Sequence, residues 1–182
     1  MHAIRLHQVA EDCLKLLVIR HAIAVAREEF ATTGRNDDAR PLTKVGRAKM
    51  QQGVRGLLRV VPRIALLATS PLVRARQTAR IVSAAYDDGL DVEETDVLRP
   101  DAANSAFLAW ARERRDRPLV AVVGHEPHLS SLVSWLLTGD PRPVLQLKKG
   151  AACLLEMGAT PRRGNASLLW ALAPAHLRAL GR

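Results

Sequence analysis

The chain has 182 residues, of which 48% are apolar and 25% charged, with a formal net charge of +9. These values are typical of one globular domain with a sizeable core. No apolar run approaches the ~20 residues of a membrane helix, and residues 1–13 lack the apolar stretch of a signal peptide, so we expect a cytoplasmic protein without membrane contact.

Strand and helix patterns alternate through the first half of the chain. A strand is predicted at 14–20, and a helix begins after the capping residue Thr43, where apolar residues recur every three or four positions. A second strand is predicted at 64–69. Ser70 and Pro71 follow it with a capping hydroxyl and a proline, which together predict the start of another helix.

The second half continues the alternation and ends with two apolar runs that we expect to form antiparallel edge strands. Its predicted elements are, in order, 92–97, 104–115, 119–123, 129–137, 151–157 and 168–172. This pattern predicts an α/β fold, a three-layer α/β/α sandwich with a mostly parallel sheet. We expect one domain over 1–182, with an N-terminal extension at 1–13 and a helix or tail at 173–182.

Residues suited to phosphate chemistry follow three of the predicted strands. Arg20-His21 ends the first strand, His125 follows the fourth, and Arg74 lies one turn beyond the second. Because ligands bind beyond the carboxyl ends of strands in open α/β sheets, we expect these side chains to converge. A neutral imidazole is a nucleophile near neutral pH, and a guanidinium binds two phosphate oxygens. Together they predict one phosphate site.

Each of these residues also has a simpler interpretation. His21 alone is compatible with a buried structural histidine, and His125 with the plain end of a strand. Arg74 precedes Arg76 and Arg80, as on a solvated helix face. Their order and shared context favour the phosphate site over three separate coincidences.

Four ordered segments resemble motifs of the histidine phosphatase superfamily, which has the phosphoglycerate-mutase-like fold. They are VIRHAIA (18–24), RPLTKVG (40–46), ATSPLVRARQTA (68–79) and VGHEP (123–127). The likeness spans roughly residues 14–157 and is greatest to the short bacterial phosphohistidine phosphatases. Many members have glycine where this chain has Ala22, and the Arg-His-Ala-x-Ala form occurs in that branch.

The resemblance implies a metal-independent phosphatase without a cofactor, in which His21 accepts the phosphate. Arg20 and Arg74 would bind the phosphate, and His125 would complete the pocket. The identity of the general acid is undecided: we favour Asp101, which is also compatible with an ordinary turn residue. The alternatives are Glu94, Asp96 and Glu126. A phosphohistidine substrate needs little acid, because imidazole, with a pKa of roughly 6.5, is a good leaving group.

The spacing of the elements bears on the substrate. Residues 86–119 have room for a short strand and one helix only, and the loop 21–41 can flank the site without closing it. A site without a lid cannot sequester a small molecule from water, but it admits a phosphate displayed on a protein. We therefore expect a phosphorylated protein as partner. A small phosphomonoester or polyphosphate, or a non-catalytic phosphate-binding module, is the alternative.

The basic excess lies mostly near the C-terminus, where residues 142–182 hold seven Lys and Arg against the single acid Glu156. A solvated surface, an acidic partner and nucleic acid all fit such a region. Aromatic residues make up only 3% of the chain, too few for stacking on the bases of single-stranded nucleic acid, so we expect no nucleic-acid partner.

The two cysteines, Cys13 and Cys153, show neither metal spacing nor a disulfide framework.

Overall fold

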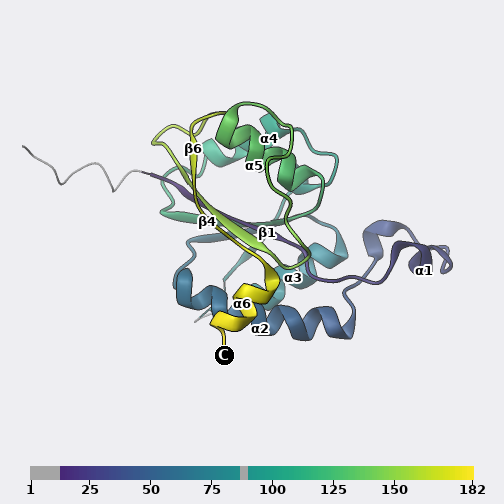
Figure 1. Cartoon of the computed structure of the whole chain (residues 1–182). Helices are drawn as coiled ribbons and strands as arrows, with labels where there is room; N and C mark the ends of the chain where they lie inside the picture. Colours follow the sequence, from purple (N-terminus) through teal and green to yellow (C-terminus); the bar gives the residue numbers. More distant parts are fainter. Residues whose placement is uncertain (1–12, 87–89) are drawn as a thin grey trace, which may run out of the picture.

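The computed structural model describes residues 13–86 and 90–182, and six strands form one mixed sheet within them (Figure 1). The strands are β1 (Lys15–Arg20), β2 (Leu66–Thr69), β3 (Val92–Glu94), β4 (Leu119–Gly124), β5 (Ala152–Met157) and β6 (Ala166–Leu172). Their order is β3-β2-β4-β1-β5-β6. The first four in this order run parallel, while β5 pairs antiparallel with β1 and β6 antiparallel with β5. The sheet is therefore mostly parallel, as predicted.

Helices cover both faces of this sheet, which confirms the three-layer arrangement. The helices are α1 (Arg27–Ala31), α2 (Lys44–Val60), α3 (Val73–Ser83), α4 (Asn104–Arg112), α5 (His128–Thr138) and α6 (Pro174–Leu180). In Figure 1, α2, α3 and α6 lie below the sheet, α4 and α5 lie above it, and α1 projects to one side. No helix in the described part of the chain has the length and apolar character needed to cross a bilayer.

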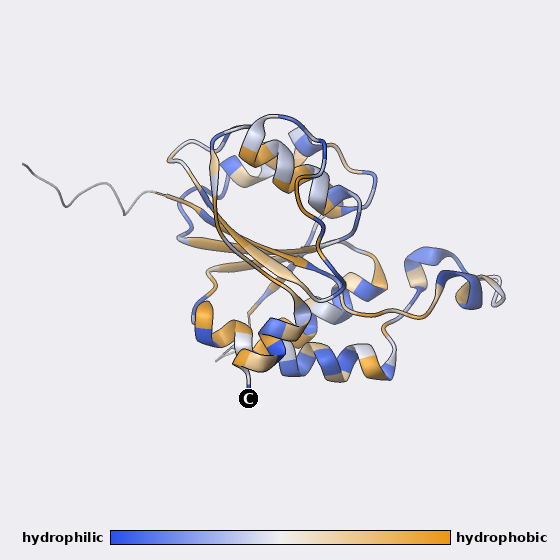
Figure 2. Ribbon diagram, viewed as in Figure 1, coloured by the Kyte–Doolittle hydropathy of each residue, from blue (hydrophilic) through white to orange (hydrophobic). Residues whose placement is uncertain are grey.

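The central strand β1 is buried on both faces, which explains its unbroken apolar sequence. Leu16 and Val18 pack in the core that contains α4 and α5 residues, while Leu17 and Ile19 pack in the core that contains α2 and α3 residues. The central strands are accordingly mostly apolar in Figure 2, whereas the helices carry polar and apolar residues on different sides. Each fully buried side chain of this kind contributes about 1.5–3 kcal/mol, so the end of β1 is a rigid place for a reactive residue.

The start of α2 agrees with the prediction, but the start of α3 does not. Thr43 caps α2, and its Oγ1 accepts a hydrogen bond from the Gly46 N–H at 2.9 Å. Helix α3 begins at Val73, and its N-cap residue is Leu72, which makes no side-chain cap. The prediction of a Ser70 cap was wrong, because the Ser70 hydroxyl is buried beside His125 in the turn before the helix.

Two further elements differ from the prediction, and the C-terminal segment agrees with one of its two predicted forms. Strand β5 is not an edge strand, because it lies between β1 and β6. The loop 21–41 contains α1 and a 3₁₀ turn at Asp37–Ala39, and neither was predicted from its polar sequence. Of the helix or tail predicted at 173–182, the structure has the helix α6, which packs closely on α2: a Cβ on Gly56 would overlap the Leu177 carbonyl oxygen. Of the N-terminal extension, only Cys13 is among the described residues.

Candidate active site

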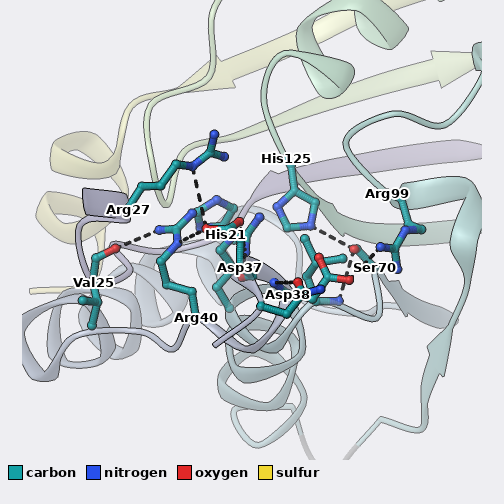
Figure 3. A network of polar contacts seen from close by, with 12 residues as sticks. His21, Val25, Arg27, Asp37, Asp38, Arg40, Ser70, Arg99 and His125 are labelled. Carbon is teal, nitrogen blue, oxygen red and sulfur yellow. Dashed lines mark hydrogen bonds and ion pairs between the residues drawn. The ribbon is translucent and has the colours of Figure 1, made fainter. Parts of the chain in front are cut away.

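The two histidines lie side by side because β1 and β4 are neighbouring parallel strands. Arg20 is paired with Gly124 in the sheet register, so the next residue of each strand is a histidine at the same level. The His21 N–H donates to the Gly124 carbonyl at 3.1 Å, and the imidazole centroids of His21 and His125 are 5.1 Å apart (Figure 3). The predicted convergence of these strand ends is present in the structure.

A cavity of about 340 Å³ opens over this pair of rings. His21, His125, Arg20 and Arg74 all line it. Arg40 lines it too, although no role was predicted for this residue. The side chains of Arg40 and Arg74 are 8% and 4% exposed. Buried guanidiniums beside two imidazoles form a site for an anion with several oxygens.

His21 is held as a neutral imidazole with a defined free nitrogen. Its Nδ1 lies 2.7 Å from the Ala22 carbonyl oxygen, and because a carbonyl can only accept, Nδ1 carries the hydrogen and Nε2 keeps its lone pair. Burial, reinforced by the positive charges of Arg74 and Arg20, lowers the pKa of His21 to about 3. At neutral pH, Nε2 of this buried ring is therefore available as a nucleophile.

His125 is also neutral, and Ser70 fixes its ring. Its Nε2 lies 2.9 Å from the Ser70 Oγ, while its buried Nδ1 has no hydrogen-bond partner among the described residues. Burial, followed by the proximity of His21 and Arg74, lowers the pKa of His125 to about 2. If the Ser70 hydroxyl donates to Nε2, Nδ1 carries the hydrogen and can donate to a phosphate oxygen.

Asp37 connects the arginines of the cavity (Figure 3). Its backbone carbonyl accepts from the Arg74 Nη1 at 2.9 Å, and its Oδ2 lies 3.2 Å from the same nitrogen. Its Oδ1 accepts from the Arg40 Nε at 2.7 Å and lies 3.7 Å from the Arg27 Nε. The hydrogen bond from Arg40 holds the pKa of Asp37 below its usual range. One carboxylate thus orients two buried guanidiniums that would otherwise repel each other.

Helix α3 is joined to the chain that follows β1 by side-chain hydrogen bonds. The Ala22 N–H donates to the Thr78 Oγ1 at 3.0 Å, and the Thr78 hydroxyl donates to the Arg74 carbonyl at 2.7 Å. The Leu42 N–H donates to the Gln77 Oε1 at 2.8 Å. These contacts fix the distance between the first turn of α3 and the His21 backbone.

Arg20 and Glu126 both bind the backbone of Leu147. The Arg20 Nη1 donates to the Leu147 carbonyl at 2.7 Å. The Glu126 Oε1 accepts from the Ser130 hydroxyl at 2.7 Å and from the Leu147 N–H at 3.2 Å. Burial lowers the pKa of Arg20, and the charge of Glu126 opposes that shift. The loop at Leu147 therefore holds both side chains in place.

Of the four candidate acids, Glu126 alone lines the cavity. The Asp101 side chain is 86% exposed and lies 4.0 Å from the Arg99 Nε; Pro100, its neighbour, lines the cavity in its place. Glu94 and Asp96 are also on the surface, paired with Arg76 and Arg99. The turn at residues 99–101 thus directs the favoured acid away from the histidines.

Comparisons with known proteins agree with this geometry. Residues 16–100 match the model of the histidine phosphatase superfamily (branch 1). An uncharacterized protein of Picosynechococcus sp. is 33% identical over 148 residues, which cover 80% of this chain and 87% of the relative. The chain belongs to the histidine phosphatase superfamily.

Solved structures show the same fold at lower identity. The protein histidine phosphatase SixA complexed with tungstate matches with a TM-score of 0.74 and 22% identity, over 90% of this chain and 99% of its own. The alpha-ribazole phosphatase of Shigella flexneri matches with a TM-score of 0.68 and 19% identity, over 88% and 96%. Membership of the histidine phosphatase superfamily supports a phosphatase enzyme that acts on a phosphorylated substrate.

Sequence reasoning missed three residues that organise this histidine phosphatase site: Asp37, Arg40 and Ser70. Arg40 opens the RPLT segment that carries part of the resemblance, so its position in that motif was the available signal. Asp37 lies in a polar stretch of turn composition, which gave no reason to separate it from Asp38.

No group of three His, Cys, Asp or Glu side chains within residues 13–86 and 90–182 is arranged to hold a metal ion.

Proposed function

We propose that this protein is a metal-independent phosphatase that removes phosphate from phosphohistidine on a protein, through a covalent intermediate on His21. The observation that carries the proposal is the pair of neutral imidazoles, 5.1 Å apart, in a cavity lined by buried guanidiniums. One ring can attack a phosphorus atom while the second ring and the arginines stabilise its oxygens.

In the first step, the His21 Nε2 forms a bond to phosphorus as the bond to the leaving imidazole breaks. The leaving nitrogen takes the bonding electron pair and gains a proton from solvent or from a cavity acid. Arg20, Arg40 and Arg74 neutralise the charge on the phosphoryl oxygens, and the His125 Nδ1–H donates a hydrogen bond to one of them. Such positioning and charge stabilisation provide most of the catalysis of phosphoryl transfer.

In the second step, water attacks the phosphorus of the phosphoenzyme and the bond to Nε2 breaks. Inorganic phosphate leaves and His21 is again a neutral imidazole. We assign the proton of the attacking water to Glu126 rather than to Asp101, because the Glu126 carboxylate lines the cavity and its Oε1 is fixed by two hydrogen bonds.

A protein substrate is favoured over a small one by what surrounds the cavity. Between α3 and β4, the described chain holds only β3, a 3₁₀ turn and α4, and α4 packs in the core of the far face of the sheet. No segment of the described chain there is long enough to fold over the site as a lid. An uncovered cavity gives a side chain on a protein surface direct access to His21.

The test is to trap the intermediate with a ³²P-labelled phosphohistidine peptide. We expect acid-labile, alkali-stable label on the wild-type protein and none on the His21→Ala variant. Label on His21→Ala would refute the assigned nucleophile. Comparison of kcat/KM for matched phosphohistidine and phosphoserine peptides tests the substrate class, and a preference for phosphoserine would favour the phosphomonoester alternative.

A further inference from the structure

A second cavity of about 380 Å³ adjoins the catalytic one. Arg20 and Lys149 line both cavities, so the two are separated by little more than these side chains. His21 lines the catalytic cavity, and the next residue, Ala22, lines the second. We call the second one the side cavity. A molecule that places a phosphate over His21 can therefore extend past Arg20 and Lys149 into the side cavity.

The floor of the side cavity is apolar. Ala22 and Ile23 follow β1, Met50 comes from α2, and Pro174 begins α6. Gly150 adopts a φ of +81°, and a Cβ there would meet only Met50 and Pro174 at ordinary contact distances. The absence of a side chain at this left-handed position keeps the floor open. The floor can therefore take up an apolar group.

The rim of the side cavity is cationic. Lys49, Lys148 and Arg178 line it in addition to the two shared residues, and no Asp or Glu does. None of these three has an ion-pair partner among residues 13–86 and 90–182. Helix α2 adds to the positive field, with five Lys and Arg residues and no acidic one. The rim is thus complementary to a carboxylate.

We propose that the side cavity binds the segment of the substrate protein next to its phosphohistidine, receiving an apolar side chain with an acidic neighbour. This inference rests on the proposed function and names the sequence feature that the enzyme selects. A polyphosphate needs cations along its whole length, and the apolar floor would leave its charges without partners. A peptide segment supplies both an apolar group and a carboxylate. At about 3.3 Å per extended residue, both lie within about three positions of the phosphohistidine.

The test compares two phosphohistidine peptides of equal length, prepared with phosphoramidate. One carries Leu and Glu within three residues of the phosphohistidine, and the other carries Ser and Gln there. We expect wild-type kcat/KM to favour the first peptide about tenfold. In the double variant Lys49→Ala/Lys148→Ala the preference falls about three- to tenfold through a higher KM, the range expected for two exposed ion pairs. Turnover of phosphoramidate, whose ammonia leaving group cannot reach the side cavity, stays unchanged.

The matched control is Arg47→Ala/Arg55→Ala, which removes two cations of α2 that line a different cavity, between α2 and α3. It should retain the preference. Equal loss in both double variants would show general charge attraction and overturn the subsite. Equal turnover of the two peptides by the wild-type enzyme would also overturn it, while leaving the proposed function intact.

Two further outcomes separate the alternatives. Wild-type enzyme that hydrolyses phosphoramidate but neither peptide would refute the proposed function and the subsite with it. A higher kcat/KM for 1-naphthyl phosphate than for either peptide, lost in Lys49→Ala/Lys148→Ala, would assign the side cavity to a small leaving group and overturn the peptide proposal.

Discussion

The catalytic cavity and the side cavity are both cationic, but they hold their charges in opposite ways. In the catalytic cavity, Arg74 and Arg40 are buried and both are bound by Asp37. At the side cavity, Lys49 and Lys148 are exposed and have no acidic partner among the described residues. A buried, paired charge keeps its geometry and is little screened by salt, whereas an exposed one moves and is screened. Catalysis requires buried charges with a fixed geometry, whereas the recognition of varied substrate proteins tolerates exposed and mobile charges.

The largest effect that this comparison predicts is at Arg74. The Arg74→Ala variant should lose about 10²–10³-fold in kcat for phosphoramidate, the scale of one lost contact to the transition-state charge. Arg76→Ala is the matched control, because Arg76 lies two residues along α3 with its side chain 37% exposed and paired with Glu94. A similar loss in both variants would mean that burial and fixed geometry do not set the contribution of an arginine here.

A smaller effect is expected when the partner of the buried arginines is neutralised. Asp37→Asn keeps the backbone carbonyl that accepts from Arg74 but removes the charge between the guanidiniums. We expect about a tenfold loss in kcat, comparable to one hydrogen bond to a charged group, and an altered inhibition constant for inorganic phosphate.

Asp38→Asn is the control for that substitution. Asp38 occupies the same 3₁₀ turn with a similar exposure, but it pairs with Arg99, which does not line the catalytic cavity. Its kcat and phosphate inhibition should stay at wild-type values. If Asp37→Asn lowers the melting temperature without changing phosphate inhibition more than Asp38→Asn does, Asp37 has a structural role only.

These pairs also show why the sequence predicted some site residues and not others. His21 and His125 were found because each follows an apolar strand directly, and adjacent parallel strands end at one level. Asp37 and Asp38 are indistinguishable in sequence, since their roles depend on how the loop 21–41 folds over the first turn of α3. Ser70 matched a helix cap locally, but its hydroxyl faces His125, 55 positions away. Contacts between distant segments are not encoded in a local pattern.

Burial of His21 and His125 as neutral imidazoles makes the stability of the protein depend on pH. The pKa values of His21 and His125, about 3 and about 2, lie below the ordinary value of 6.5. Folding therefore keeps both rings neutral, and the stability this provides is complete above pH 6.5 and is lost as the pH falls toward 3. Each ring should lower the free energy of unfolding by about 1.4 kcal/mol per pH unit over this range.

Urea denaturation at pH 7, 6 and 5, in a buffer without phosphate, measures this slope. The His125→Gln variant should lose the contribution of one proton, about 1.4 kcal/mol per pH unit, whatever its stability at pH 7. The side-cavity variant Lys49→Ala/Lys148→Ala should keep the wild-type slope, because an ordinary lysine takes up no proton between pH 7 and pH 5. An unchanged slope in His125→Gln would mean that the His125 ring of the wild-type protein is solvated in the folded state. The catalytic cavity would then not differ from the side cavity in burial.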